Sequence, residues 1–139
     1  MRISLEADYA VRIVQCLAND GGRLGAKEIS KRTNVTERFT LKILHKLVVD
    51  NIVISFKGVG GGYELKKQPQ DITLKEVIEI IDGPIAISKC QHDDYDCCDD
   101  CLCYFHHVFI DASKEIANKF EKVNFLPKKC NMGQRKSTK

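Results

Sequence analysis

Glycines in the middle of the chain limit what its first half can fold into. Four of the five residues at 58–62 are glycine, and short apolar runs with strand character lie on either side, at 52–56 and 63–65. Two strands joined by a glycine-rich turn predict a β-hairpin. A nucleotide-binding loop would require a Gly-Lys-Ser/Thr ending and a helix directly after the glycines, and neither follows here. We therefore expect a hairpin whose narrow tip, beside Lys57, can approach another molecule closely; a loose surface hairpin without a partner is the alternative.

Three amphipathic helices are expected before the hairpin, over 5–18, 26–33 and the residues that follow Thr36. Thr36 is a favourable N-cap, and Asn34 makes the turn between the second and third helices. Two helices joined by so short a turn, the second of them basic on its outer side, form a helix-turn-helix. Helical spacing alone would suit any small bundle, and the hairpin is what favours a winged helix-turn-helix domain over 1–83. The third helix is expected to bury Phe39, Ile43, Leu44, Leu47 and Val48.

Charge is unevenly distributed along the chain, whose formal net charge is only +3. Residues 1–70 hold 12 Lys/Arg and 7 Asp/Glu, residues 71–127 hold 5 and 12, and residues 128–139 hold 5 and none. A basic first half suits a polyanion such as DNA, although a mixed, solvated surface would give the same counts. The cations expected on or beside the outer face of the third helix are Arg38, Lys42, His45 and Lys46.

A fourth helix and a long last helix complete the predicted fold, which is mainly α with a small β-hairpin wing. Thr73 and Glu76 form a capping box, so the fourth helix starts at Leu74. The last helix is expected over about 104–123, with an apolar stripe made of Phe105, Val108, Phe109, Ala112, Ile116 and Phe120. Such a stripe packs either on its own domain or on a second copy. We expect a homodimer, because helix-turn-helix proteins usually read two half-sites, and therefore assign 104–126 as a dimerisation helix.

The sequence indicates neither a membrane segment nor an enzyme site. No stretch approaches the ~20 apolar residues of a transmembrane helix, and Glu6, Asp8 and Arg12 interrupt the first apolar run, unlike a signal peptide. The chain has no nucleophile motif and no pattern of paired carboxylates. We therefore expect a cytoplasmic protein that is not an enzyme and has no membrane partner. Residues 127–139 form a basic tail that is expected to be disordered.

Several stretches resemble the Rrf-two family, which includes the IscR-, NsrR-, RirA- and CymR-type regulators. They are MRIS and DYAVR at the start, the Ile29-Ser30 helix, KGVGGGY at 57–63 and DITLKEVIEIIDGPI at 71–85. The resemblance covers about residues 1–125, and the wing together with the ITLKEVIE stretch is a specific combination. It implies a dimeric winged-helix transcription regulator, either a repressor or an activator, whose subunits cross through their long C-terminal helices. Its partner would be double-stranded promoter DNA with an imperfectly palindromic operator.

The resemblance also implies which residues contact DNA. They are Thr36, Arg38 and Lys42 in the recognition helix, and Lys57 and Gly58 at the wing tip, which enters the minor groove. One position departs from the family. IscR-type members carry a glutamate that reads a base, and this chain has Leu41 at that place. The operator sequence therefore cannot be transferred from them.

Five of the seven cysteines lie close together, namely Cys90, Cys97, Cys98, Cys101 and Cys103. In a reducing cytosol such a group indicates metal ligands or a redox sensor rather than structural disulfides. Many members of the family hold an iron–sulfur cluster on three cysteines before the last helix, and Cys90, Cys97 and Cys103 stand close to that spacing. The resemblance implies a 2Fe–2S or 4Fe–4S cluster on these three, with His106 as the fourth ligand by analogy with the IscR branch.

Alternatives stay open for this site. Asp8 of the partner subunit matches the fourth ligand of the NsrR branch, Cys101 is a further candidate, and Cys98 can take the place of Cys97. Cys98 and Cys101 also have the spacing of a zinc pair. The residues that could complete a zinc site are Cys90, Cys103 and His106. Without metal, Cys97, Cys98 and Cys101 could act as thiol sensors that form disulfides on oxidation.

The number and type of the expected cluster ligands indicate which signal the protein would sense. Three cysteines and one weaker ligand leave a cluster reactive, which suits a sensor of iron, redox or nitric oxide status better than an electron carrier. We therefore expect residues 84–103, called the cysteine segment below, to control DNA binding. The alternative is a zinc-stabilised or thiol-based winged-helix regulator whose signal is a partner protein or cysteine oxidation.

Overall fold

Local sequence signals explain where the helices start and end in the computed structural model, which describes residues 2–88, 91 and 104–127. The first three helices are α1 (Leu5–Asp20), α2 (Ala26–Thr33) and α3 (Glu37–Val49). Ser4 caps α1 by accepting the Ala7 N–H at 3.0 Å, and Thr36 caps α3 by accepting the Phe39 N–H at 3.4 Å. Asn34, in the left-handed conformation, ends α2. The predicted helix-turn-helix therefore forms with the predicted cap and turn residues.

The apolar sides of these helices meet in one core. Its largest fully buried side chains from the three helices are Ile13, Leu17, Ile29, Ile43, Leu44 and Leu47. Phe39 differs from the prediction, because it is 42% exposed. It lies in the first turn of α3, where its ring meets Tyr9 edge-on at a centroid distance of 6.0 Å. Phe39 therefore lies at the rim of the core, next to the outer surface of α3.

The predicted hairpin follows α3 and is joined to the segment between α1 and α2 by an isolated β-bridge. β1 (Val53–Phe56) pairs antiparallel with β2 (Gly62–Leu65). Leu24, before α2, exchanges two backbone hydrogen bonds with Tyr63, at 2.9 and 2.8 Å. Gly62 permits this approach: its φ is +143°, and a Cβ there would lie 2.6 Å from the carbonyl oxygen of Leu24. The result is the predicted architecture, mainly helical with a two-stranded wing.

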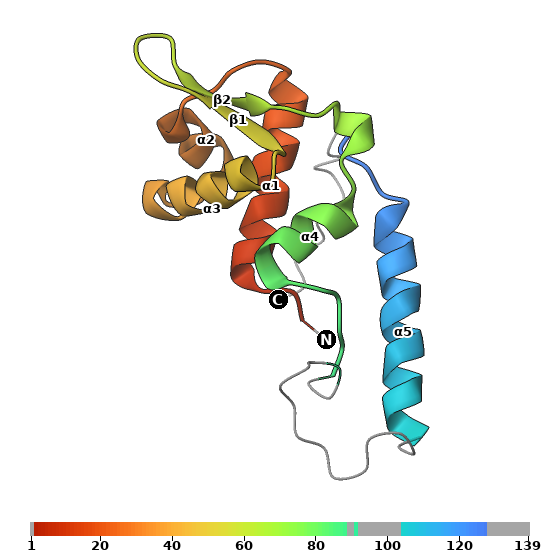
Figure 1. The fold of residues 1–139 in the computed structure, drawn as a ribbon. Helices are drawn as coiled ribbons and strands as arrows, with labels where there is room; N and C mark the ends of the chain where they lie inside the picture. Colours follow the sequence, from red (N-terminus) through yellow and green to blue (C-terminus); the bar gives the residue numbers. More distant parts are fainter. Residues whose placement is uncertain (1, 89–90, 92–103, 128–139) are drawn as a thin grey trace, which may run out of the picture.

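The second half of the chain contains one helix that packs on the winged-helix core and a longer helix that packs on the first. These elements are the 3₁₀ turn η1 (Pro69–Asp71), α4 (Leu74–Asp82) and α5 (Tyr104–Glu121). α4 lies between α1 and α5, and α5 stands alongside the domain (Figure 1). Ser113 is the one buried residue among those described in α5. Two members of the predicted apolar stripe, Phe105 and Val108, are 64% and 43% exposed.

The last helix is shorter than the sequence predicts. α5 ends at Glu121, so the predicted dimerisation helix over 104–126 is too long at its C-terminal end. The chain then returns to the winged-helix domain, where the Leu74 N–H donates to the Val123 carbonyl oxygen at 2.8 Å. Phe125 is only 3% exposed and belongs to the core of that domain. A continued helix would carry Phe125 away from this core, which explains the early end.

Two further predictions concern membrane-spanning helices and the C-terminal tail. Within residues 2–88, 91 and 104–127, none of the helices has the length and apolar character needed to cross a membrane. Apart from Pro127, the predicted basic tail at 127–139 lies outside the described residues, as does most of the cysteine segment.

Candidate nucleic-acid interface and sensor region

The outer face of α3 presents the residues that the sequence assigns to DNA contact. Thr36, Arg38 and Lys42 are all exposed, and so is His45. They lie opposite the buried side of the helix, which is formed by Thr40, Ile43, Leu44 and Leu47. Leu41, which stands where the resemblance would place a base-reading glutamate, is 44% exposed at the flank of this face. The face is therefore polar and basic with one accessible apolar side chain.

One cation of α3 is used differently from the prediction. Lys46 donates to Glu6 of α1 at 2.7 Å, and Lys42 lies 3.5 Å from the other carboxylate oxygen of Glu6. The hydrogen bond from Lys46, with the charges of both lysines, holds the pKa of Glu6 below its ordinary value and outweighs the opposing effect of burial. Sequence reasoning missed Glu6, because helical periodicity does not show which residues of α1 face α3.

The wing tip presents Lys57 and Gly58 to solvent, as predicted. Gly58 has a φ of +82°, in the left-handed region that favours glycine. A residue outside the hairpin braces it: the Arg23 guanidinium lies over the Phe56 ring, 3.4 Å from its centroid, and donates to the Gly60 carbonyl oxygen at 3.2 Å. The arginine thus fixes the hairpin and adds a cation beside its tip. No periodicity or motif in the sequence indicated this role.

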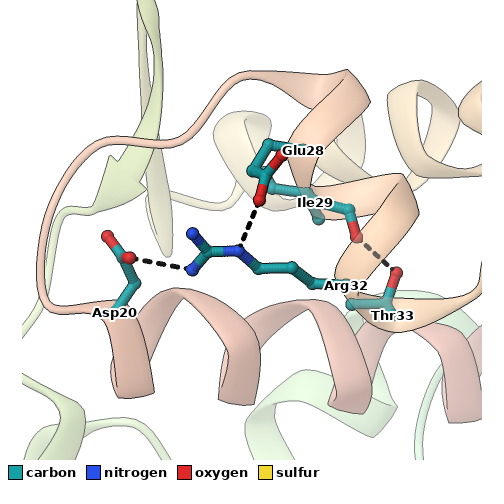
Figure 2. A network of polar contacts seen from close by, with 5 residues as sticks. All are labelled: Asp20, Glu28, Ile29, Arg32 and Thr33. Carbon is teal, nitrogen blue, oxygen red and sulfur yellow. Dashed lines mark hydrogen bonds and ion pairs between the residues drawn. The ribbon is translucent and has the colours of Figure 1, made fainter.

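Not every cation of the helix-turn-helix is available to DNA. Arg32, at the end of α2, donates to Asp20 of α1 and to Glu28 of α2, each at 2.9 Å, as Figure 2 shows. These two carboxylates raise the pKa of Arg32, with Glu28 as the larger cause. In the same view the Thr33 hydroxyl donates to the Ile29 carbonyl oxygen at 2.7 Å. Arg32 therefore joins α2 to the end of α1, which helps to fix the orientation of α2.

The cysteine segment, which is predicted to be the sensor, is described only in part. Cys90, Cys97, Cys98, Cys101 and Cys103 all lie outside the described residues. His106 is half-buried in the first turn of α5, directly after the cysteine segment. Asp8 of this chain forms an ion pair with Arg12 at 2.7 Å on α1. Among the described residues, no three His, Cys, Asp or Glu side chains are grouped as a metal site would require.

A hydrogen-bonded clasp fixes the start of the cysteine segment against α5. The buried Ser113 hydroxyl accepts the Ile87 N–H at 3.0 Å and donates to Gln91 at 3.1 Å. The same Gln91 oxygen accepts the Ser88 N–H at 3.2 Å. Ser113 lies seven residues after His106, which is two helical turns, so both occupy the same side of α5. The segment that leads to Cys90 is thus held on the side of α5 that carries His106.

This clasp gives a first testable prediction. Replacing Ser113 with alanine leaves the Ile87 N–H without its acceptor, and a buried hydrogen bond contributes roughly 1 kcal/mol. We therefore expect amide exchange at Ile87 and Ser88 to become about fivefold faster or more, measured by hydrogen–deuterium exchange. Lys114→Ala, at the exposed neighbouring position, serves as the control and should leave both amides unchanged. Equal exchange in the Ser113→Ala and wild-type proteins would show that the clasp does not hold this segment.

The chain matches a known protein family and a relative of similar length. A family model described as Rrf2, iron-dependent transcriptional regulator, matches residues 3–126. The rrf2-like HTH-type transcriptional regulator of Rhodobacter capsulatus is 34% identical over an alignment of 120 residues that covers 79% of this chain and 80% of that protein.

Solved structures show the same fold at lower sequence identity. IscR of T. potens superposes with a TM-score of 0.72 at 21% identity, covering 90% of this chain and 83% of that one. CymR, the global cysteine regulator of B. subtilis, superposes with a TM-score of 0.73 at 22% identity, covering 90% and 93%. At these identities the two structures support the winged-helix fold alone.

Proposed function

Because the chain belongs to the Rrf2 family of transcriptional regulators, we propose that it binds promoter DNA as a homodimer and that an iron–sulfur cluster on the cysteine segment controls this binding. The family and the relatives named above are transcriptional regulators and not enzymes, as the sequence analysis expected. The observation that carries the proposal is the exposed basic face of α3 next to a wing braced by Arg23.

The proposed DNA contacts follow from this surface. α3 and the wing tip lie on the side of the domain away from α5 (Figure 1), so a duplex could meet both without touching α5. We assign α3 to the major groove, with Thr36, Arg38 and Lys42 at its exposed side. Lys57 and Gly58 would follow the adjacent minor groove, where a glycine tip lets backbone amides and a lysine approach phosphate.

Salt dependence tests the proposed contact surface. Each phosphate that a cation neutralises changes the slope of log K against log salt by about 0.9. We expect Lys42→Ala and Lys57→Ala each to weaken binding of a random-sequence duplex of about 30 base pairs and to make the slope shallower by nearly that amount. Fluorescence anisotropy over a salt series measures both quantities. Lys119→Ala on α5 is the matched control. If the α3 and wing variants behave like this control, the surface is wrongly assigned.

The cluster proposal rests on the donor set of the chain. Thiolates are soft ligands that iron–sulfur clusters require, and Cys90, Cys97 and Cys103 supply three, with Cys103 directly before α5. His106 in the first turn of α5 is the proposed fourth ligand, since its side of the helix also holds the clasped start of the segment. When bound, the cluster would supply a group that responds to iron supply, oxidants or nitric oxide. A zinc site is the alternative, and metal analysis separates the two.

The described residues suggest how such a site would control DNA binding. The cysteine segment connects α4 to α5, and α4 packs on α1, which in turn contacts α3. In the proposed dimer α5 sets the distance between two recognition helices, which must lie about 34 Å apart to read successive turns of one duplex face. A change in the segment that rotates one α5 against the other would therefore lower operator affinity.

A further inference from the structure

Glu6 of α1 lies against the DNA-facing helix, within reach of two of its lysines. The structure points to a role for it that rests on the DNA binding proposed above. We propose that Glu6 is a positioning residue of the DNA-binding surface: it is anchored by Lys46 and competes with phosphate for Lys42. Glu6 would thereby lower affinity for DNA of any sequence.

The two lysines lie at different distances from the Glu6 carboxylate. Lys42 and Lys46 are four residues apart on α3, so both ammonium groups reach the same carboxylate. Lys46 makes a direct hydrogen bond of 2.7 Å, and its side chain is 36% exposed. Lys42 lies at 3.5 Å and is 56% exposed. Lys46 is therefore the fixed partner, whereas Lys42 can exchange the carboxylate for a phosphate oxygen at small cost.

The first turn of α1, from which Glu6 extends, is anchored to the rest of the domain. Glu6 is two residues after Ser4, whose N–H donates to the Asp82 carboxylate at 3.0 Å and whose hydroxyl donates to the same group. The Ser4 oxygen also caps α1 by accepting the Ala7 N–H at 3.0 Å. The first turn of α1 is thus joined to the end of α4, and the Glu6 side chain is only 21% exposed.

The negative charge of Glu6 determines the direction of its expected effect on DNA affinity. An ionised Glu6 reduces the local charge of the three groups from +2 to +1, and it repels any phosphate that approaches Lys42. Binding to DNA of arbitrary sequence depends almost entirely on such phosphate contacts. Contacts to base edges by other residues of α3 do not depend on this carboxylate. Glu6 therefore lowers affinity for DNA of any sequence by about the same factor, since the phosphate contact of Lys42 is available to operator and other DNA alike.

The decisive variant is Glu6→Gln, which keeps the shape and removes the charge. With a random-sequence duplex of about 30 base pairs at about 0.1 M salt, we expect its Kd to fall roughly three- to tenfold, and its salt slope to steepen by up to about 0.9. Glu6→Asp retains the charge and should return both values towards wild type. A thermal melt of each variant reports folding. A merely structural role predicts the opposite sign, namely weaker DNA binding together with a lower Tm.

Two further proteins make the test specific. In the Lys42→Ala background the gain from Glu6→Gln should largely disappear, since the coupling runs through Lys42. Glu121→Gln on α5 removes an equal charge that faces Lys75 of α4 instead of Lys42, and it should leave affinity unchanged. The inference is overturned by unchanged or weaker binding of Glu6→Gln, by an equal gain in Glu121→Gln, or by a gain that persists without Lys42. Wild-type protein without salt-dependent DNA binding would instead refute the DNA-binding proposal itself.

Discussion

Replacing Cys90 with alanine is expected to abolish the iron–sulfur cluster. The proposed site has three thiolates and one weaker ligand, so removing one thiolate leaves too few soft donors to hold a cluster. Protein purified without oxygen should show visible absorption, with iron and sulfide bound in similar amounts per chain. In Cys90→Ala we expect the absorption and both elements to fall to background. The melting of the winged-helix domain should change little, because Cys90 lies in the segment between α4 and α5.

Cys16→Ala is the matched control for this experiment. Cys16 is half-buried on α1 and packs against the core, and its burial raises the pKa of the thiol, which keeps it protonated and unsuited to bind metal. Its replacement should leave iron and sulfide content unchanged. A colourless wild-type protein with one zinc per chain would refute the cluster and support the zinc alternative. An unchanged spectrum in Cys90→Ala would remove this residue from the ligand set.

The same measurement separates the open ligand choices. Alanine replacements of Cys97 and Cys98 should differ, because only one of them is expected to be a ligand. His106→Ala and Asp8→Asn compare the two proposed fourth ligands. Loss of cluster stability in Asp8→Asn would have two possible causes, because this substitution also breaks the ion pair of Asp8 with Arg12. Arg12→Ala, which breaks that pair but keeps the carboxylate, distinguishes the two.

Much of the fold follows from signals that are local in sequence. The cap at Thr36, the left-handed turn at Asn34 and the start of α4 after Thr73 each depend on residues within one helical turn. The glycine run at 58–62 was sufficient to predict the wing for the same reason. Local backbone chemistry decides these positions, and the surrounding fold does not override it.

The features that the sequence did not predict are contacts between distant segments. Glu6 meets Lys46 across 40 positions, and Arg23 reaches the Gly60 carbonyl oxygen across 37. Phe125 returns to the core after α5 and so ends the predicted helix early. The local sequence around each of these residues gives no sign of its contact. The contacts form only when the helices and the hairpin pack together. The cysteine ligands belong to a third class, in which spacing and family resemblance suggest the chemistry without fixing the geometry.

The second large effect is expected at the proposed dimer interface, where Val108→Glu should produce a monomer. α5 exposes apolar side chains that a helix beside its own domain would ordinarily cover, with Tyr104, Phe105 and Val108 at 73%, 64% and 43% exposure. A second α5 packed against this stripe would bury them. A glutamate at 108 would place a charge in that interface, and burying an unpaired charge is costly. Light scattering coupled to size exclusion should show the mass of one chain in place of two.

DNA binding should fall with dimerisation, because a monomer contacts one half-site instead of two, and we expect at least a hundredfold loss of affinity for an operator selected from a random pool. Asn118→Glu places the same charge on an exposed polar position of α5, well away from the stripe, and should remain dimeric. Circular dichroism should show equal helix content in both variants, since position 108 is partly exposed already. A Val108→Glu protein that stays dimeric would assign the interface to another surface. A monomeric protein with undiminished operator affinity would contradict the requirement for two recognition helices.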